Sequence, residues 1–388
     1  MKHFTLILLI ILSTFFLSSC SGLKNIQDIT YIVAIGMDYN QEKDEYTVYL
    51  QALNFSNVAK QESTRPTDKV PVFVGKATGE SLNIAVSKLY SKTEPYLFFG
   101  HVNALVLSQE IVTHRNIEVV EEIGRNRSLR STIQVVSTKD NIEDIFRVEA
   151  LFNYPTLYTI LFKNYASEVA RDEIRPITLM EFLKSYYEPM GVAKMPSVKI
   201  DDTHWTSDGK YPSLYFDGYE IFQNRKHMSH LPFHDAIFLN WLLDNRVVLN
   251  RKIEKGDELL ATVEFLNPKL KFHYTKGTEY PEFTIDLSVN VNLLEELAEV
   301  KIEELTKLIE DDIKEDIQGL YQKGIEHKMD ILNVGENWYR KKPGKYRELK
   351  NSYAFYLDEN SLQHVNVSVN IFHFNSYKYD AEKSEELE

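Results

Sequence analysis

Four side chains that can bind a metal ion or move a proton lie close together in the string KHMSHLPFHD. They are His227, His230, His234 and Asp235, and imidazole nitrogens at such spacings are common ligands of zinc. Pro232 interrupts the segment, however, and the hairpin expected here would point the side chains in different directions. The favoured alternative is a solvent-exposed turn that is rich in histidine, so we predict no metal at this site.

No other group of residues predicts an active site. Asp201, Asp202 and His204 form a second polar group, which we interpret as a surface loop. The chain contains no phosphate-binding glycine run followed by Lys-Ser/Thr, no His-Glu-x-x-His, no Gly-x-Ser-x-Gly and no cysteine nucleophile. We therefore expect no catalytic residues and no cofactor, and we predict a protein that is not an enzyme.

The single cysteine of the chain, Cys20, can carry a different chemistry. It follows a short basic start and an apolar run over residues 4–17, which is shorter than the roughly 20 residues that a membrane-spanning helix needs. This length is typical of a secretory signal peptide. The string LSSC, ending at Cys20, resembles the lipobox of bacterial lipoproteins, in which the thiol receives a diacylglyceryl group. We predict cleavage before Cys20 and lipidation at that residue; the alternative is an ordinary secretory signal or an uncleaved anchor.

Composition describes the body that such an anchor would hold. Cleavage would leave 369 of the 388 residues and, with the loss of Lys2, change the formal net charge from −13 to −14. A body this acidic is poorly suited to nucleic acid and to anionic lipid head groups, so attachment must come from the anchor or from protein partners. The 43% hydrophobic content is sufficient for real cores, and a monomer with one cysteine forms no internal disulfide.

Strands and helices alternate along the first part of the body, which is typical of an α/β domain over residues 29–150. Strands at residues 29–37 and 45–55 are expected to form a hairpin. Further strands are predicted at residues 72–76, 102–107 and 132–136, and helices at residues 80–90, 109–123 and 141–146. The aromatic run at residues 96–99 is interpreted as buried core, with an exposed docking patch as the alternative.

The rest of the body is expected to form a smaller middle module over residues 151–210, rich in prolines, and a C-terminal α/β domain over residues 211–375. In the latter we predict a hairpin at residues 214–223 and 226–231, a helix at 235–243, and strands at 259–265, 283–293 and 365–374. A long amphipathic helix is predicted at residues 295–323, and a basic, aromatic helix at 335–353 with a break near Pro343.

The long helix carries acidic residues opposite its apolar stripe, which we interpret as its solvated side, with a partner surface as the alternative. These residues are Glu296, Glu299, Glu303, Glu310, Asp311 and Glu315. With a signal peptide at residues 1–19, a lipidated tether at 20–28 and a charged tail at 376–388, the chain is predicted to be a three-domain ectodomain. Its fold class is α+β or mixed α/β, with mixed sheets packed by helices.

Several strings, in order along nearly the whole chain, resemble the Ger(x)C lipoproteins, the C subunits of spore germinant receptors. They are the lipobox, YIVAIGMD with EYTVYLQ, LFFGHVNALVLSQEI, YFDGYEIFQNRK with LNWLL, NVGENWYRKKPGKYRELKNSY and VNVSVNIF. The segment VEEIGRNRSLRSTIQVVSTKD fits the family loosely. The resemblance implies a lipoprotein on the outer face of the spore inner membrane, beside membrane-embedded A and B subunits, with a role in nutrient-triggered germination. It assigns one functional residue, Cys20, as the acylated residue.

Three functions are weighed against one another. The leading hypothesis is a receptor subunit that acts by contact, since an anchor keeps weak interfaces at high effective concentration. The first alternative is a solute-binding lipoprotein that delivers a ligand to a transporter, although that class usually has two similar lobes and the halves of this chain differ. The second is a tethered hydrolase acting on the cell wall, which no paired-carboxylate or nucleophile pattern supports.

Overall fold

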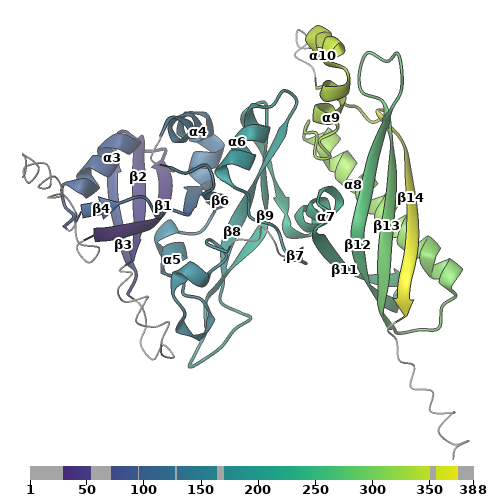
Figure 1. Cartoon of the computed structure of the whole chain (residues 1–388), viewed down its shortest axis with the longest axis horizontal. Helices are drawn as coiled ribbons and strands as arrows, with labels where there is room; N and C mark the ends of the chain where they lie inside the picture. The colour runs from purple at the N-terminus through teal and green to yellow at the C-terminus, as the bar shows by residue number, and fades with distance from the viewer. Residues whose placement is uncertain are drawn as a thin grey trace, which may run out of the picture.

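Two β-sheets, both packed against helices, make up the protein (Figure 1). The computed structural model describes residues 29–53, 71–94, 96–126, 129–163, 170–349 and 355–374. The first sheet has nine strands in the order β10-β9-β8-β6-β5-β1-β2-β3, with β4 paired beside β1. Its strands are β1 Ile29–Asn40, β2 Glu45–Leu53, β3 Phe73–Gly79, β4 Tyr96–Phe98, β5 Ala104–Ser108, β6 Gln134–Thr138, β8 Val192–Asp201, β9 Ser213–Gln223 and β10 Lys226–Pro232.

The second sheet has five strands in the order β14-β13-β12-β11-β7. Its strands are β7 Ala170–Arg171, β11 Val247–Lys255, β12 Glu258–Tyr274, β13 Phe283–Glu296 and β14 Leu362–Phe374. Both sheets combine antiparallel and parallel pairs: β1 is antiparallel to β2 but parallel to β5, and β13 is antiparallel to β12 but parallel to β14. The predicted class of mixed sheets packed by helices is confirmed.

Helices cover both faces of the first sheet. One face packs against α3, α4 and α6, and the other packs against α5 and α7. The helical segments are α3 Leu82–Tyr90, a π-helical turn Ile111–Arg115, α4 Asn116–Arg125, α5 Ile142–Arg147, 3-10 turns Leu151–Asn153 and Thr156–Tyr158, α6 Leu179–Tyr187, α7 Phe233–Leu243, α8 Ile302–Glu326, α9 Val334–Lys341 and α10 Pro343–Leu349.

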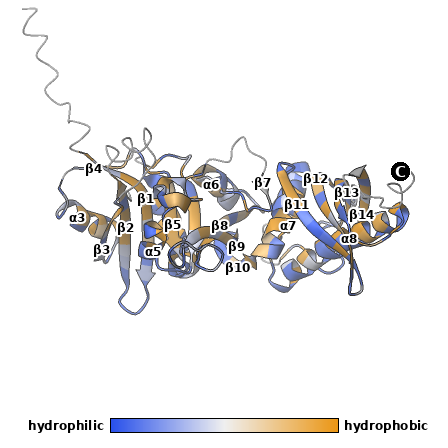
Figure 2. Ribbon diagram, turned by 90° about the horizontal axis from the view of Figure 1, so that it is seen from below, coloured by the Kyte–Doolittle hydropathy of each residue, from blue (hydrophilic) through white to orange (hydrophobic). Residues whose placement is uncertain are grey.

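Helix α7 lies between the two sheets and is shared by them. Residues 236–242 are all buried, so the helix has no solvated face, and Figure 2 shows it as largely hydrophobic. It contacts β9 and β10 of the first sheet and β11 and β12 of the second. A helix that is apolar all round is stable only when it is surrounded by other elements. Buried side chains of both sheets and of α7 accordingly belong to one continuous core.

The long helix α8 packs an apolar stripe against the second sheet. Leu305, Ile309, Ile313, Ile317 and Leu320 are buried at helical spacing, as predicted. The predicted start at residue 295 is wrong, because residues 295 and 296 still pair with β12 as the end of β13. The predicted break near Pro343 is confirmed: α9 ends at Lys341 and α10 begins at the proline, which lacks the N–H that would continue the helix.

Both predicted hairpins, β1–β2 and β9–β10, are confirmed by antiparallel pairing. Strands β8 and β11 are not predicted by the sequence analysis. Pro196 lies within β8, and a proline in a central strand argues against strand assignment from sequence. Because β8 lies between β6 and β9, strands from all three expected domains share the first sheet. The division of domains at residues 150 and 210 stays a prediction, and the predicted signal peptide, tether and tail lie outside the described residues.

Candidate functional site

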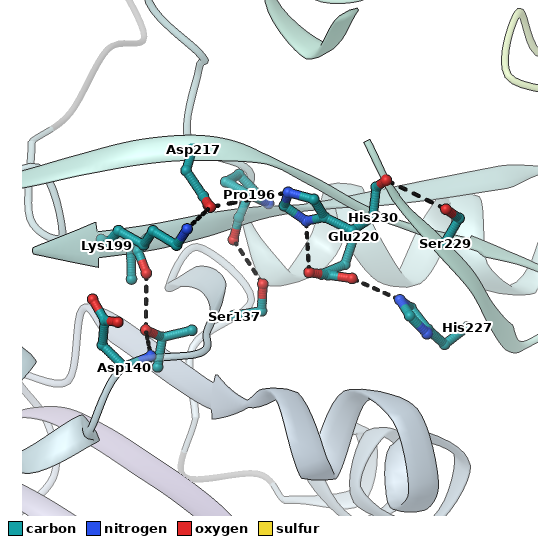
Figure 3. Close-up of polar contacts among 11 residues, drawn as sticks. Ser137, Asp140, Pro196, Lys199, Asp217, Glu220, His227, Ser229 and His230 are labelled. Atoms are coloured by element: carbon teal, nitrogen blue, oxygen red, sulfur yellow. Dashed lines mark hydrogen bonds and ion pairs between the residues drawn. The ribbon is translucent and has the colours of Figure 1, made fainter. Parts of the chain in front are cut away.

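His227 and His230 of β10 both bind one carboxylate, that of Glu220 on the neighbouring strand β9 (Figure 3). Nε2 of His227 lies 2.6 Å from Oε2 of Glu220, and Nδ1 of His230 lies 2.9 Å from Oε1. Side chains three residues apart normally point to opposite faces of a strand. A bulge between His227 and Ser229 removes this offset, so both imidazoles face Glu220.

Glu220 is fully buried, and its charge depends on the two imidazoles. Burial by itself raises the pKa of this carboxyl, but the hydrogen bonds from His227 and His230 and their charge outweigh it and lower the pKa to about 2. A carboxylate that is ionised at neutral pH, with both oxygens occupied, has no proton to donate as a general acid. The arrangement is suited to holding the β9–β10 hairpin together.

A second carboxylate, Asp217, extends this cluster toward β8. Its Oδ2 lies 3.0 Å from Nζ of Lys199 and 3.9 Å from Nε2 of His230. The hydrogen bond with Asp217 raises the pKa of Lys199. In Figure 3 the side chains of Lys199, Asp217, His230, Glu220 and His227 lie in a row that crosses β8, β9 and β10. The row therefore connects three neighbouring strands through their side chains.

The other two residues of the histidine string lie elsewhere. His234 and Asp235 belong to α7, where Nε2 of His234 accepts a hydrogen bond from Arg251 at 2.9 Å and Asp235 pairs with Lys323. Within the described part of the chain, no group of three or more His, Cys, Asp or Glu side chains is arranged to hold a metal ion. The interpretation as a solvent-exposed turn is wrong for His227 and His230, because the buried carboxylate of Glu220 holds both in the structure.

Part of the cluster around Glu220 has a signal in the sequence. In the predicted β9–β10 hairpin, His227 lies opposite Phe222 and therefore on the same face as Glu220, two residues earlier in β9. An acidic residue in an otherwise hydrophobic strand, paired with a histidine across a hairpin, predicts a buried ion pair. The bulge between His227 and Ser229, which brings His230 opposite Glu220, has no comparable signal in the sequence.

Asp201, Asp202 and His204 lie at the exposed end of β8, which confirms their interpretation as a surface loop. The Asp201 carboxylate accepts hydrogen bonds from Thr203 and lies 2.7 Å from Nδ1 of His204. The hydrogen bonds from Thr203 lower the pKa of Asp201 to about 2. The side chain of His204 is 81% exposed, so the group caps a turn.

In the aromatic run at residues 96–99, the side chains of β4 point alternately to the two sides of the strand. Leu97 is buried, whereas Tyr96 and Phe98 are 54% and 39% exposed. Successive side chains of a strand point to opposite sides, so neither burial nor exposure holds for the whole run.

The acidic side of α8 is solvated in part. Glu303, Asp311 and Glu315 are exposed, as predicted for the solvated side of the helix. Glu310 differs, because its Oε1 accepts a hydrogen bond from the backbone N–H of Val369 in β14. One member of the expected acidic face therefore attaches the helix to the edge strand of the second sheet.

A buried carboxylate that the sequence analysis does not identify connects the two halves of the molecule. Asp330 follows α8 and is 1% exposed. It accepts hydrogen bonds from the backbone N–H groups of Val334 and Gly335 at 2.9 and 2.6 Å, and from Oη of Tyr356 at 2.8 Å. Gln223, at the end of β9 in the first sheet, donates to Oη of Tyr356 and accepts from the N–H of Asp330. These partners are far apart in the chain, so no spacing indicates the network.

Burial is the largest effect on Asp330 and raises its pKa to about 6, although its three hydrogen bonds act in the opposite direction. Gly335 is required by the same packing, because a Cβ at this position would lie 2.4 Å from Oη of Tyr356. The glycine of the string NVGENWY thus has a physical role: it lets the aromatic ring approach the backbone of α9.

Cys20, the predicted lipidation site, lies outside the described residues. Within those residues the structure has no helix with the length and apolar character that a membrane crossing requires.

Comparisons with known proteins give one consistent result. The family model described as "Spore germination protein N-terminal domain" matches residues 22–200, and the model described as "Spore germination B3/GerAC like, C-terminal" matches residues 217–375. Spore germination protein KC of Bacillus subtilis (strain 168) is 21% identical over 369 residues, covering 90% of both chains.

The fold is shared with a solved structure. The crystal structure of the GerBC protein superposes with a TM-score of 0.53 at 16% identity, covering 88% of this chain and 98% of that one. Two family models together span most of the chain, in the order that the resemblance of its strings predicted. The chain therefore belongs to the Ger(x)C family of spore germination proteins, the C subunits of germinant receptors.

Proposed function

We propose that this chain is a lipoprotein subunit of a nutrient germinant receptor, cleaved before Cys20 and anchored there by acyl chains. It acts without catalysis, by contact with membrane-embedded A and B subunits on the outer face of the spore inner membrane. The observation that carries this proposal is the pair of family matches, which begins two residues after Cys20 and runs through both sheets.

The geometry of the anchor supports action at the membrane surface. β1 begins at Ile29, nine residues after Cys20. Even a fully extended chain spans at most about 3.5 Å per residue, so the start of β1 would lie within about 30 Å of the lipid. Two or more acyl chains, each stabilised by about 0.8 kcal/mol per buried CH₂, anchor a protein durably. Confinement to this layer raises the effective concentration at which weak contacts with membrane partners form.

The two buried carboxylates, Glu220 and Asp330, support a role in contact rather than in catalysis. The carboxylate of Glu220 is occupied by two imidazoles, and that of Asp330 by two backbone N–H groups and a tyrosine hydroxyl. Both carboxylates are thus held by protein partners and maintain the structure of the body.

Cys20→Ala tests the proposal in spores. We expect this variant to incorporate no labelled palmitate, to keep residues 1–19, and to lose the germination response to nutrients while sporulation is normal. The control is Ser21→Ala, which changes the neighbouring residue and leaves the thiol intact. A Cys20→Ala protein that is still cleaved, stays in the membrane fraction and supports nutrient germination contradicts the anchor. Normal germination of a deletion strain with every nutrient tested contradicts the receptor role.

A further inference from the structure

A pocket of about 760 Å³ opens where strands β6 and β8 of the first sheet separate. The two strands pair only through Ser137 with Ser197 and Thr138 with Val198. Near the start of both strands, residues 175–178 lie beside β6, where the carbonyl of Ile177 accepts the N–H of Val135. Residues of α6 and of the C-terminal end of α7 complete the wall. A volume of this size is typical of sites that hold small molecules, roughly 300–1,000 Å³.

Lys194 of β8 lines this pocket, and its ammonium group has no ion-paired carboxylate among the described residues. Among the residues that the structure describes, no hydrogen-bond acceptor or carboxylate pairs with its Nζ, which lies 5.7 Å from the centre of the Tyr219 ring. Removal of an ammonium from bulk water is costly unless an opposite charge or acceptors replace the water. Burial accordingly lowers the pKa of Lys194 to about 8, although the charge of Asp244 acts in the opposite direction.

The other charged side chains of the pocket are already paired. Asp244 accepts hydrogen bonds from Arg175 at 2.9 Å and from Arg246 at 2.9 Å. Glu181 accepts from the N–H and the hydroxyl of Thr178 in the capping box of α6. Three cations and two carboxylates line the pocket, so one positive charge, that of Lys194, is left over.

We propose that this pocket is a binding site for a small organic monoanion, whose carboxylate pairs with Lys194. A single uncompensated ammonium matches one negative charge, whereas the two charges of a phosphate would leave one buried without a partner. Phe162, Ile177 and Leu243 offer apolar surface to the body of the ligand. Asn103, Thr132 and Ser185 offer hydrogen bonds to hydroxyl or amino substituents. The site does not depend on the lipid anchor, so the two proposals can fail separately.

The test measures thermal unfolding of the full chain in mild detergent, followed by tryptophan fluorescence, with three matched pairs of probes. Each pair is a sodium carboxylate and its uncharged amide: lactate and lactamide, 4-methylpentanoate and 4-methylpentanamide, benzoate and benzamide, with sodium chloride for equal ionic strength. At about ten times the Kd, we expect at least one carboxylate to raise the Tm by about 2 °C while its amide has no effect. Lys194→Met removes this shift, and Lys184→Met, a change on α6 that does not line the pocket, keeps it.

A second measurement uses the unaltered chain, so it does not depend on the folding of a variant. Lys194 is acetylated with a limiting reagent, and its rate is followed by mass spectrometry. We expect the stabilising carboxylate to slow this rate about tenfold at ten times the Kd, and to leave the rate at Lys184 unchanged. The proposal is overturned if no carboxylate in the panel shifts the Tm or protects Lys194. It is also overturned if the amides or inorganic phosphate raise the Tm or protect Lys194 as strongly as the carboxylates do. Persistence of the Tm shift in Lys194→Met overturns it as well.

Discussion

Asp330 makes the stability of this protein depend on pH in a direction that can be measured. Its pKa of about 6 in the folded chain lies above the ordinary aspartate value of 3.8. A difference of roughly two pH units corresponds to about 3 kcal/mol. Because the folded state binds the proton more tightly than the unfolded state, this contribution is complete below about pH 4. It decreases as the pH rises and is lost above about pH 6.

Asp330→Asn removes this titration and keeps most of the shape of the side chain. The amide oxygen can still accept from the N–H of Val334, but the N–H of Gly335 loses its acceptor, which costs about 1–3 kcal/mol. We expect the variant to be less stable than the native chain near pH 4. Between pH 4 and pH 7 we expect the native chain to lose about 3 kcal/mol of stability relative to the variant, because only the native chain carries the cost of ionisation. The variant should therefore be at least as stable as the native chain near pH 7.

Urea unfolding at a series of pH values measures both quantities. Tryptophan fluorescence is a suitable probe because Trp338, in α9 next to the network, is fully buried. The control is Asp311→Asn, the same change at an exposed carboxylate of α8, whose difference from the native chain should stay constant. A difference between native chain and Asp330→Asn that does not change over this pH range would refute the reasoning.

Two further predictions concern the β9–β10 hairpin. Glu220→Ala leaves two imidazoles without their acceptor and should cost about 3 kcal/mol of unfolding free energy at neutral pH. The pKa of Glu220 is lowered from 4.5 to about 2, so its ionised form stabilises the folded chain fully only above about pH 4.5. In urea titrations, the difference in unfolding free energy between the native chain and Glu220→Ala should therefore be largest above pH 4.5 and should decrease as the pH falls toward 2. Gly218→Ala should cost about 2 kcal/mol or more, since φ is +153° and a Cβ would lie 2.1 Å from the carbonyl oxygen of Leu231. The matched change Gly124→Ala, in α4 with open space around it, should be neutral or stabilise by about 0.5–1 kcal/mol, and equal effects at both glycines would contradict the packing argument.

The elements that the sequence predicts well are those with a clear hydrophobic pattern. A continuous apolar run identifies β1, which is buried on both faces of the first sheet. The spacing of buried residues identifies α8, because one side of this helix packs on the second sheet. β8 is different: its residues contact helices on one face and a polar pocket on the other, and it contains both Pro196 and Lys194. No period marks such a strand, although it is central in the first sheet.

The residues of the candidate sites also differ in how well the sequence predicts them. The histidines of β10 are visible in the sequence, but their common orientation toward Glu220 depends on a bulge. No pattern in the sequence indicates the roles of Asp330 and Lys194. The network of Asp330 joins residues separated by up to 133 positions, and the pocket of Lys194 exists only because two parallel strands diverge. Such features depend on tertiary structure, which spacing along the chain does not encode.

The shared position of α7 has a consequence for how this subunit can be dissected. A fragment that ends before residue 233 would expose to solvent the face of β9 and β10 that α7 covers. A fragment that begins at residue 233 would expose the buried residues 236–242 of α7, which are shielded by the first sheet in the intact chain. Neither fragment is therefore expected to fold independently, and the two sheets should unfold in one cooperative transition. Because α7 packs against strands of both sheets, a displacement of one sheet is expected to move the other with it.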